Sequence, residues 1–475
     1  MRTKRNILVS VLAIVLCFGL LSGCGAKSTV NNTVTPMEKE ESLAVSFDFI
    51  GGKDVMPIGC FHGPFTSTYN QDGNIVPDYM TDEFFSALSE AGFNLITASN
   101  ADWLRSRESL ERGMKLGEKY GIGWFVGDGN ITGNPKLTVE EAKNYISQYY
   151  DYPAFCGMTV LDEPNTPYYN KDGNAARMMD LFSNQAQILQ NELGLYCYIS
   201  MYPNGKLQAD QRELYVRYVE DIIANLQPRI LMWDFYPWDK GEAEEDDQRG
   251  YFWNMDLMRS YSLQHEIPFW AFVQAGSQWY VTAKDSITPY YPNEPQFNWN
   301  ISTCLAFGVQ GFQYFPTFQY VDFARAETTE WDFQRNGIFG AWGNKNQWYH
   351  YAKNAHAHIA VIDEVLMNSV TKGVIVNGEA ATKDTEYVEC IIDSGSFQEL
   401  VSVTGDTMVG CFNYNGKTAL YVVNYSTVYA QYITLNLNDT HNLKVVQGTD
   451  TSYVQTDALV LDMAAGEGVL VVIEE

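Results

Sequence analysis

The segment Gly157-Met158-Thr159-Val160-Leu161-Asp162-Glu163-Pro164-Asn165 combines the features that decide the fold and the chemistry of this chain. Its apolar first half predicts a buried strand. The strand has to end before Pro164, because proline has no N–H to donate to a sheet. Glu163 is therefore predicted at the tip of a strand, beside a second acid, Asp162. A carboxylate held there is a candidate general acid or base; the alternative is an acid that caps the next helix or faces water.

Eight strand-like runs, of which this segment is the fourth, alternate with helix-like patterns. The strand-like runs are 56–61, 94–99, 123–127, 156–161, 195–201, 230–235, 269–273 and 311–315. The helix-like patterns are 81–91, 106–120, 138–150, 174–193, 211–226, 251–264, 297–307 and 347–367. This order predicts an α/β fold, a (β/α)8 TIM barrel over residues 46–368. A doubly wound open sheet is the alternative, but residues 57–64 lack the Gly-rich phosphate turn usual after its first strand.

The sequence changes character after residue 368. Short alternating runs follow one another at 387–392, 400–403, 407–412, 419–424, 430–437, 443–446 and 468–473. Turn signals such as Asn413-Tyr414-Asn415-Gly416 separate them. This pattern predicts a small all-β sandwich domain over residues 369–475, which either packs on the barrel or contacts carbohydrate.

The N-terminus predicts export from the cytoplasm. A basic start at residues 1–5 precedes an apolar run at 7–21, which is typical of a signal peptide and too short to span a membrane comfortably. Leu21-Ser22-Gly23-Cys24 resembles the lipobox of bacterial lipoproteins, in which cleavage precedes a cysteine that becomes lipidated. We therefore expect a signal peptide at 1–23, lipidation of Cys24, a flexible tether at 24–45 and a place on the cell membrane or surface. An ordinary signal peptide with a chance cysteine is the alternative.

The charge of the chain limits its partners. The 475 residues hold 31 basic and 58 acidic side chains, a net charge of −27. Removal of residues 1–23 would leave 28 against 58, or −30. Such a surface repels nucleic acid and anionic membranes, so we expect a neutral ligand and a membrane contact made by the lipid alone.

The eight cysteines do not form the spacing of a disulfide framework or a metal site. Four of them lie in apolar runs, as buried thiols do. Cys390 and Cys411 could pair, and the sequence leaves this open. The chain has no Cys-x-x-Cys or His-x-x-x-His spacing, so neither a metal nor a cofactor is expected.

Polar and aromatic residues recur where the predicted strands end. In barrels of this type the working residues stand at the C-terminal ends of the strands. Sugars are bound by such a mixture, because amides and acids bond hydroxyls while aromatic faces stack on C–H surfaces. The residues predicted to bind substrate are His62, Asn100, Asp128, Asp162, Tyr202, Asn204, Tyr236, Trp238, Gln274 and Tyr314. For any one aromatic residue, simple burial in the barrel is the alternative.

The motif Asp162-Glu163-Pro164 resembles the large clan of (β/α)8 glycoside hydrolases that includes β-galactosidases, cellulases and mannanases. In that clan the fourth strand ends in Asn-Glu-Pro, and its Glu is the acid/base. The resemblance implies that Glu163 protonates the leaving glycosidic oxygen. Asp162 replaces the Asn, which in the clan contacts the sugar 2-hydroxyl.

The clan's second catalytic carboxylate is a Glu that ends strand seven, and here Gln274 stands in that place. Asp234, at the tip of the sixth predicted strand, is our first choice for the second carboxylate. Asp322, Glu327 and Glu330 are further candidates. The separation of the two carboxyls would decide between retention, at roughly 5 Å, and inversion, at about 6.5–9.5 Å, and the sequence leaves this open.

Three functions are compatible with these residues. The first is a glycoside hydrolase that cleaves neutral oligo- or polysaccharides with Glu163 and Asp234 as its two carboxylates. The second is a non-catalytic glycan-binding surface lipoprotein on a hydrolase-like barrel, which Gln274 favours. The third is another enzyme on the same barrel, such as a lyase or an esterase, although the chain has no Gly-x-Ser-x-Gly elbow.

Overall fold

The computed structural model describes residues 41–61, 63–64, 78–97, 107–164, 174–205, 207–238, 248–276, 281–282, 291–318, 331–332, 337–340 and 343–474. The predicted signal peptide, Cys24 and most of the predicted tether lie outside these residues. Residues 39–475 form one compact unit, and the boundary placed at 368–369 stays a prediction. Within the described part of the chain, no helix has the length and apolar character needed to cross a membrane.

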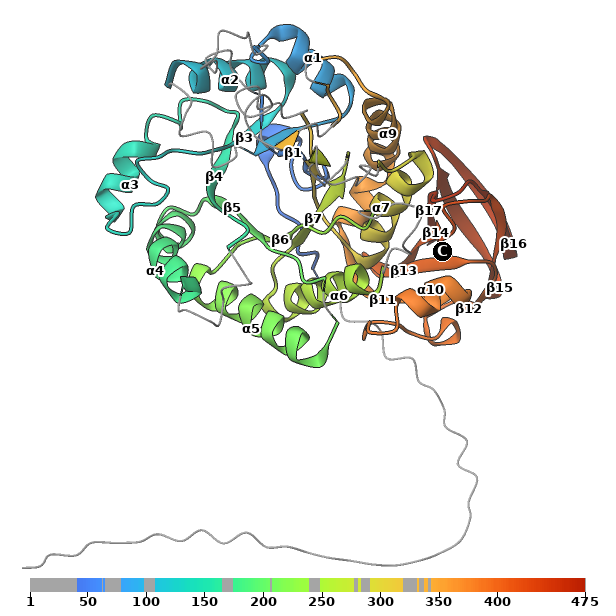
Figure 1. Cartoon of the computed structure of the whole chain (residues 1–475). Helices are drawn as coiled ribbons and strands as arrows, with labels where there is room; N and C mark the ends of the chain where they lie inside the picture. Colours follow the sequence, from blue (N-terminus) through green and yellow to red (C-terminus); the bar gives the residue numbers. More distant parts are fainter. Residues whose placement is uncertain are drawn as a thin grey trace, which may run out of the picture. The chain divides into compact units, whose positions relative to one another are not determined.

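Eight parallel strands close into a barrel in the order β1-β2-β3-β4-β5-β6-β7-β9, which confirms the TIM-barrel prediction (Figure 1). All eight predicted strands are present. They are β1 (Ile58–Phe61), β2 (Leu95–Thr97), β3 (Gly123–Val126), β4 (Phe155–Asp162), β5 (Tyr196–Met201), β6 (Leu231–Trp233), β7 (Phe269–Gln274) and β9 (Phe312–Phe315). The short strands β8 (Val281–Thr282) and β10 (Trp331–Asp332) form a separate antiparallel pair.

Helices form the outer layer around the barrel (Figure 1). They are α1 (Asp82–Glu90), α2 (Arg107–Tyr120), α3 (Val139–Ile146), α4 (Asn174–Gln187), α5 (Ala209–Leu226), α6 (Gln248–His265), α7 (Glu294–Phe307) and α9 (Gln347–Met367). Each matches a predicted helix. Helix α3 begins at a capping box, because the Thr138 side chain accepts from the Glu141 N–H and the Glu141 carboxylate accepts from the Thr138 N–H.

Aromatic side chains fill the inside of the barrel. Near the N-terminal ends of the strands, Phe47 makes edge contacts with the rings of Phe125, Tyr196 and Trp270. Towards the other end, Phe61 stacks on Tyr198 and also contacts the rings of Phe272 and Phe315. The barrel is thus a packed core, and its functional surface is the end where the strands finish.

The C-terminal region is an all-β structure, as predicted. Its strands are β11 (Ser369–Asn377), β12 (Leu400–Val403), β13 (Thr407–Tyr414), β14 (Lys417–Asn424), β15 (Gln431–Gln447), β16 (Asp450–Met463) and β17 (Gly468–Glu474). They pair antiparallel in the order β11-β13-β14-β17-β15-β12, with β16 beside β15. The pairing of β15 shifts between Asn436 and His441, and side chains from both of its halves, such as Leu435 and Leu443, enter one buried cluster. The sheet therefore folds around a core of its own, as a sandwich does.

Four elements of this region differ from the sequence prediction. The strand predicted at 387–392 is wrong, because only an isolated bridge joins Ile391 to Val374 there. Strand β11 was not predicted, since it follows α9 with no turn signal between them. Strand β16 was missed because its first nine residues have no buried face and so show no apolar alternation. The short helix α10 (Glu379–Asp384) was also missed.

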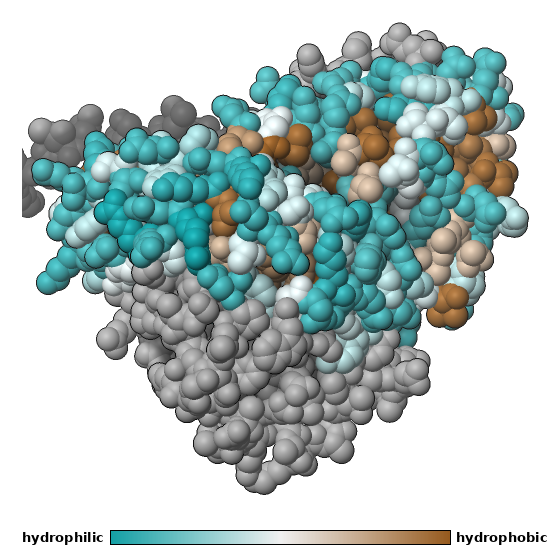
Figure 2. All heavy atoms as spheres, turned by 90° about the horizontal axis from the view of Figure 1, so that it is seen from above, coloured by the Kyte–Doolittle hydropathy of each residue, from teal (hydrophilic) through white to brown (hydrophobic). Residues whose placement is uncertain are grey.

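The C-terminal sheet packs against helix α7. Gly410 of β13 lies directly on the backbone of Ala306, where a larger side chain would overlap with it. The Ser302 hydroxyl donates to the Gly466 carbonyl oxygen at 3.1 Å. Packing on the barrel, one of the two roles considered for this region, is therefore observed. On the face seen in Figure 2, hydrophilic residues predominate and hydrophobic ones form separate clusters.

Candidate active site

Glu163 follows the last residue of β4 and has an unusual backbone. Its φ is +41°, in the left-handed region that a non-glycine residue seldom adopts. Its N–H donates to the Ser200 carbonyl oxygen of β5 at 3.0 Å, which fixes this conformation. The residue itself is exposed. Backbone strain of this kind persists where the surrounding structure enforces it, and it clusters at functional sites.

Asp162 lies beside Glu163 but is largely buried. Its Oδ1 accepts a hydrogen bond from the Tyr198 hydroxyl at 2.7 Å. Burial raises the pKa of Asp162 to about 7, and the neighbouring charge of Glu163 adds to the rise, while the Tyr198 hydrogen bond opposes it. Asp162 therefore titrates near neutrality.

Asp234 follows β6 and is 4% exposed. Burial raises the pKa of Asp234 well above its ordinary value, a hydrogen-bonding contact with the Glu163 carboxyl raises it further, and the charges of Glu163 and Asp162 contribute as well. Its Oδ1 is buried and has no hydrogen-bond partner among the described residues. The carboxyl of Asp234 therefore stays protonated to a higher pH than an exposed aspartate does. The ends of β4 and β6 bring three predicted site residues together, with β5 between them.

Two predicted tyrosines lie close to these acids. Tyr202 follows β5 and is 36% exposed. Burial raises the pKa of its hydroxyl, and so do the charges of Glu163 and Asp234. Tyr236 is buried in the barrel end, with its ring 5.7 Å from that of Phe315. Tyr202 therefore offers an accessible aromatic face, and Tyr236 lies in the packed layer of the barrel interior.

Asp128 and Asn204 are tied to neighbouring structure. The Asp128 carboxylate accepts from the Tyr149 hydroxyl at 2.7 Å and from the Asn130 N–H at 2.9 Å. The backbone of Asn204 exchanges two hydrogen bonds with the Asn254 side chain, at 3.1 and 2.8 Å. These contacts hold the loops after β3 and β5.

Gln274 ends β7 and uses its side chain as a clamp. Its Oε1 accepts from the Trp238 N–H at 2.9 Å, and its Nε2 donates to the carbonyl oxygens of Trp238 at 2.7 Å and Gly276 at 3.2 Å. The Trp238 indole packs against Trp299 of α7 and donates to the Gln296 carbonyl oxygen. The indole of Trp238 is therefore buried under α7 and is not brought to the mouth.

Tyr314 is also placed away from the mouth, which contradicts its predicted contact with substrate. Its hydroxyl and the His356 Nε2 form a hydrogen bond of 2.7 Å, and its ring packs against Phe93 and Phe297. The cause is the alternation of a strand, because neighbouring side chains point to opposite faces. In β9 it is Gln313 that points into the barrel, where it accepts a hydrogen bond from Thr97.

Several predictions cannot be placed in the structure. His62, Asn100, Asp322, Glu327 and Glu330 lie outside the described residues, as does Cys24. Among the residues that the structure does describe, no group of three or more His, Cys, Asp or Glu could hold a metal ion. Cys390 and Cys411 are both free thiols, so the pairing left open by the sequence does not occur.

The sequence reasoning missed Tyr198 and Ser200, which line the site from β5. The Tyr198 hydroxyl donates a hydrogen bond to Asp162, and the Ser200 carbonyl oxygen accepts one from the Glu163 N–H. Both face the interior of the barrel, with buried side chains. The alternation of β5 is the signal that could have identified them, because the interior face of that strand carries every second residue.

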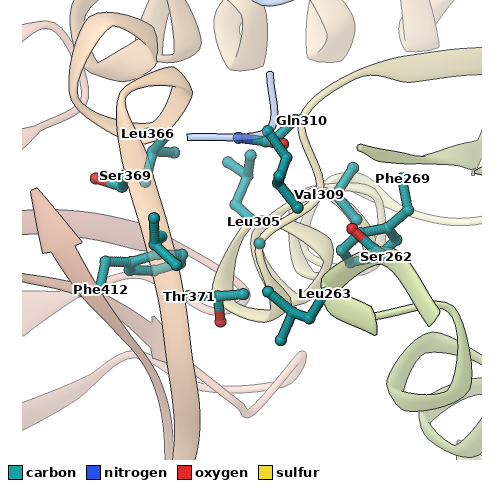
Figure 3. Close-up of a pocket in the computed structure, with 13 residues that line it drawn as sticks. Ser262, Leu263, Phe269, Leu305, Val309, Gln310, Leu366, Ser369, Thr371 and Phe412 are labelled. Atoms are coloured by element: carbon teal, nitrogen blue, oxygen red, sulfur yellow. The ribbon is translucent and has the colours of Figure 1, made fainter. Parts of the chain in front are cut away.

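A separate pocket lies at the other end of the barrel (Figure 3). Its lining includes Phe269, the first residue of β7, and residues 308–310, which precede β9. Phe412 of the C-terminal sheet closes another side. The lining is mainly apolar and contains no carboxylate or histidine, so this pocket offers no acid–base chemistry.

The chain matches no protein-family model and no curated protein. Among solved structures it is similar to a β-galactosidase from the psychrophilic Marinomonas ef1, at 11% identity and a TM-score of 0.44, over 70% of this chain and 65% of that one. It is also similar to a GH27 β-L-arabinopyranosidase from Geobacillus stearothermophilus, at 9% identity and a TM-score of 0.42, over 91% and 99% of the two chains. A family 1 β-glucosidase from Thermotoga maritima matches at 11% identity and a TM-score of 0.41, over 62% and 96%.

These three similar proteins are glycosidases, and the chain spans less than two thirds of the Marinomonas enzyme. Their low identities and TM-scores carry no argument about activity.

Proposed function

We propose that the chain is a lipid-anchored, extracytoplasmic glycoside hydrolase that acts on neutral oligo- or polysaccharides. The observation that carries this proposal is the contact between an exposed carboxyl, Glu163, and a buried one, Asp234, at the ends of two barrel strands. In the proposed reaction Glu163 donates a proton to the glycosidic oxygen while the bond from that oxygen to the anomeric carbon breaks. Water then replaces the leaving group at the anomeric carbon.

The environments of the two acids support different roles. Asp234 is buried and its pKa is raised, whereas Glu163 is exposed and can reach a substrate. A proton shared by the two carboxyls could return to Glu163 after each turnover and so restore the proton donor. Pairs of acids with contrasting environments are a recurrent basis of acid–base catalysis.

The role of Asp234 as base or nucleophile stays a prediction. Hydrolases with two catalytic carboxylates hold them about 5–5.5 Å apart for retention or about 6.5–9.5 Å apart for inversion. In the structure the two carboxyls are in contact instead. A bound sugar would have to separate them, and the exposed Glu163 is the one with room to move.

A neutral substrate fits the groups at this end of the barrel. No described lysine or arginine lowers the pKa of Asp162 or Asp234, so no described cation lies beside these two acids to bind an anionic sugar. Tyr202 supplies an accessible ring for stacking. Attachment through Cys24 rests on the sequence of residues 21–24 and would hold the enzyme at the membrane.

The test is hydrolysis by the soluble form that lacks residues 1–24, beside its Glu163→Gln variant. A panel of neutral oligosaccharides would be incubated with each protein, and released sugars would be quantified. We expect release by the wild type and a loss of about 10²-fold or more in the variant. Product anomers followed by NMR would show retention or inversion. Absence of release from every sugar, with intact folding, would contradict the proposal.

The alternative, a glycan-binding lipoprotein without turnover, is favoured by one observation. Gln274 occupies the place of the expected nucleophile, and its side chain is fully used in holding Trp238 and Gly276. This alternative predicts that a sugar binds to both proteins with equal affinity and is released unchanged. Calorimetric titration with the same panel would detect it.

A further inference from the structure

Tyr218 of α5 reaches from the helix layer to the ends of two barrel strands. It is 1% exposed, and its ring packs beside that of Tyr215. Its hydroxyl donates to the carbonyl oxygen of Pro164 at 2.9 Å and accepts from the N–H of Tyr202 at 3.2 Å. A single oxygen thus joins the chain that leaves β4 to the chain that leaves β5.

These bonds surround Glu163 on both sides. On one side its own N–H is bonded to the Ser200 carbonyl oxygen of β5. On the other, the next residue, Pro164, is held by Tyr218. Pro164 has no N–H to bond with, so its carbonyl oxygen is the only backbone group through which it can be hydrogen-bonded. The left-handed conformation of Glu163 is therefore held by hydrogen bonds at its own N–H and at the carbonyl of the next residue.

We propose that Tyr218 is a positioning residue, which holds the backbone of Glu163 in its strained conformation and so aims the carboxyl towards the substrate and Asp234. This inference rests on the proposed role of Glu163 as proton donor. A non-glycine residue with a φ of +41° returns to an ordinary backbone conformation unless neighbouring groups hold it there, so Glu163 needs such contacts. A displacement of about 1 Å at a catalytic group is enough to cost about 10²-fold in rate.

Tyr215 provides a matched control on the same helix. Its ring centroid lies 5.5 Å from that of Tyr218, and it is 3% exposed. Its hydroxyl, however, is buried with no hydrogen-bond partner in the described part of the chain. Tyr215→Phe and Tyr218→Phe each remove one buried hydroxyl oxygen from the same helix, but only the second breaks the hydrogen bonds to Pro164 and Tyr202.

The first readout is kinetic. With a sugar that the wild type hydrolyses, we expect Tyr218→Phe to lower kcat by about 10- to 100-fold while KM stays within about threefold, because binding groups remain and the proton donor is misplaced. Tyr215→Phe should keep the kcat of the wild type. Equal loss in both variants, or none in Tyr218→Phe, would overturn the inference and leave the hydrolase proposal standing.

The second readout is structural and does not depend on turnover. A crystal structure of Tyr218→Phe should show Glu163 released from its left-handed conformation, with its carboxyl displaced from Asp234. An unchanged Glu163 backbone in that crystal would overturn the inference. If the wild type hydrolyses no sugar, the proposed function fails, and the crystal structure still decides whether Tyr218 positions Glu163.

Discussion

Asp162 should make the protein less stable as the pH rises from about 4 to 7. Its pKa in the folded chain is about 7, raised chiefly by burial. In the unfolded chain an aspartate titrates near 3.9. Between these values the unfolded chain has released a proton that the folded chain still holds. The folded state is therefore favoured below pH 4, and this advantage is lost as the pH rises through the folded pKa.

The magnitude follows from the size of the shift. A rise from 3.8 to about 7 is roughly three pKa units, and each unit is about 1.4 kcal/mol, so ionised Asp162 costs about 4 kcal/mol above pH 7. Asp162→Asn removes the titration and keeps an oxygen that can accept from Tyr198. The variant should match the wild type near pH 4 and exceed its free energy of unfolding by about 4 kcal/mol at pH 8.

Urea unfolding from pH 4 to 9 measures this difference directly. The matched control is Asp221→Asn, since Asp221 is an exposed aspartate of α5. The control should follow the wild type over the whole range. A difference between Asp162→Asn and the wild type that does not change with pH would refute the argument from burial, and so would a variant that is less stable at pH 8.

Three further perturbations have defined outcomes. Asp234→Asn should lower kcat by about 10²-fold, because an amide can act neither as base nor as nucleophile, and should remove the rise of activity with pH that ionisation of the buried Asp234 is expected to give; a pH–rate profile checks both. Gln274→Ala leaves the buried N–H and carbonyl of Trp238 without partners and should cost about 2–5 kcal/mol in urea unfolding; a smaller loss would mean that water replaces the clamp. Gly59→Ala forces a methyl group into the Gln313 side chain inside the barrel and should cost about 1–3 kcal/mol, with an unchanged Tm as the contrary result.

The barrel was predictable from the sequence because its strands are buried on both faces. Such strands appear as short, continuous apolar runs, and all eight were found. The C-terminal sheet was harder to predict, because part of it is exposed. Strand β16 has no buried residue before Leu459, so no apolar pattern marks it. Strand β11 begins two residues after α9 ends, with no loop to separate them.

The candidate site was predictable only in part. The acids at the tips of β4 and β6 were found because strand ends converge in a barrel. The sequence does not show which residues of β9 face the inside of the barrel, and this misplaced Tyr314. The sequence also does not show that the side-chain amide of Gln274 is hydrogen-bonded to backbone groups. Tyr218 could not be found at all, since it lies on a helix and acts through a contact 54 residues away in the chain.

The central claim, that Glu163 protonates the leaving oxygen, is tested most directly by the dependence on the leaving group. Once a sugar is identified, kcat/KM would be measured for its dinitrophenyl and methyl glycosides with the wild type and Glu163→Gln. Dinitrophenolate departs without a proton, so we predict that the variant loses at least about 10²-fold on the methyl glycoside and much less on the dinitrophenyl glycoside. Equal losses on both substrates, or no loss on the methyl glycoside, would contradict Glu163 as the proton donor.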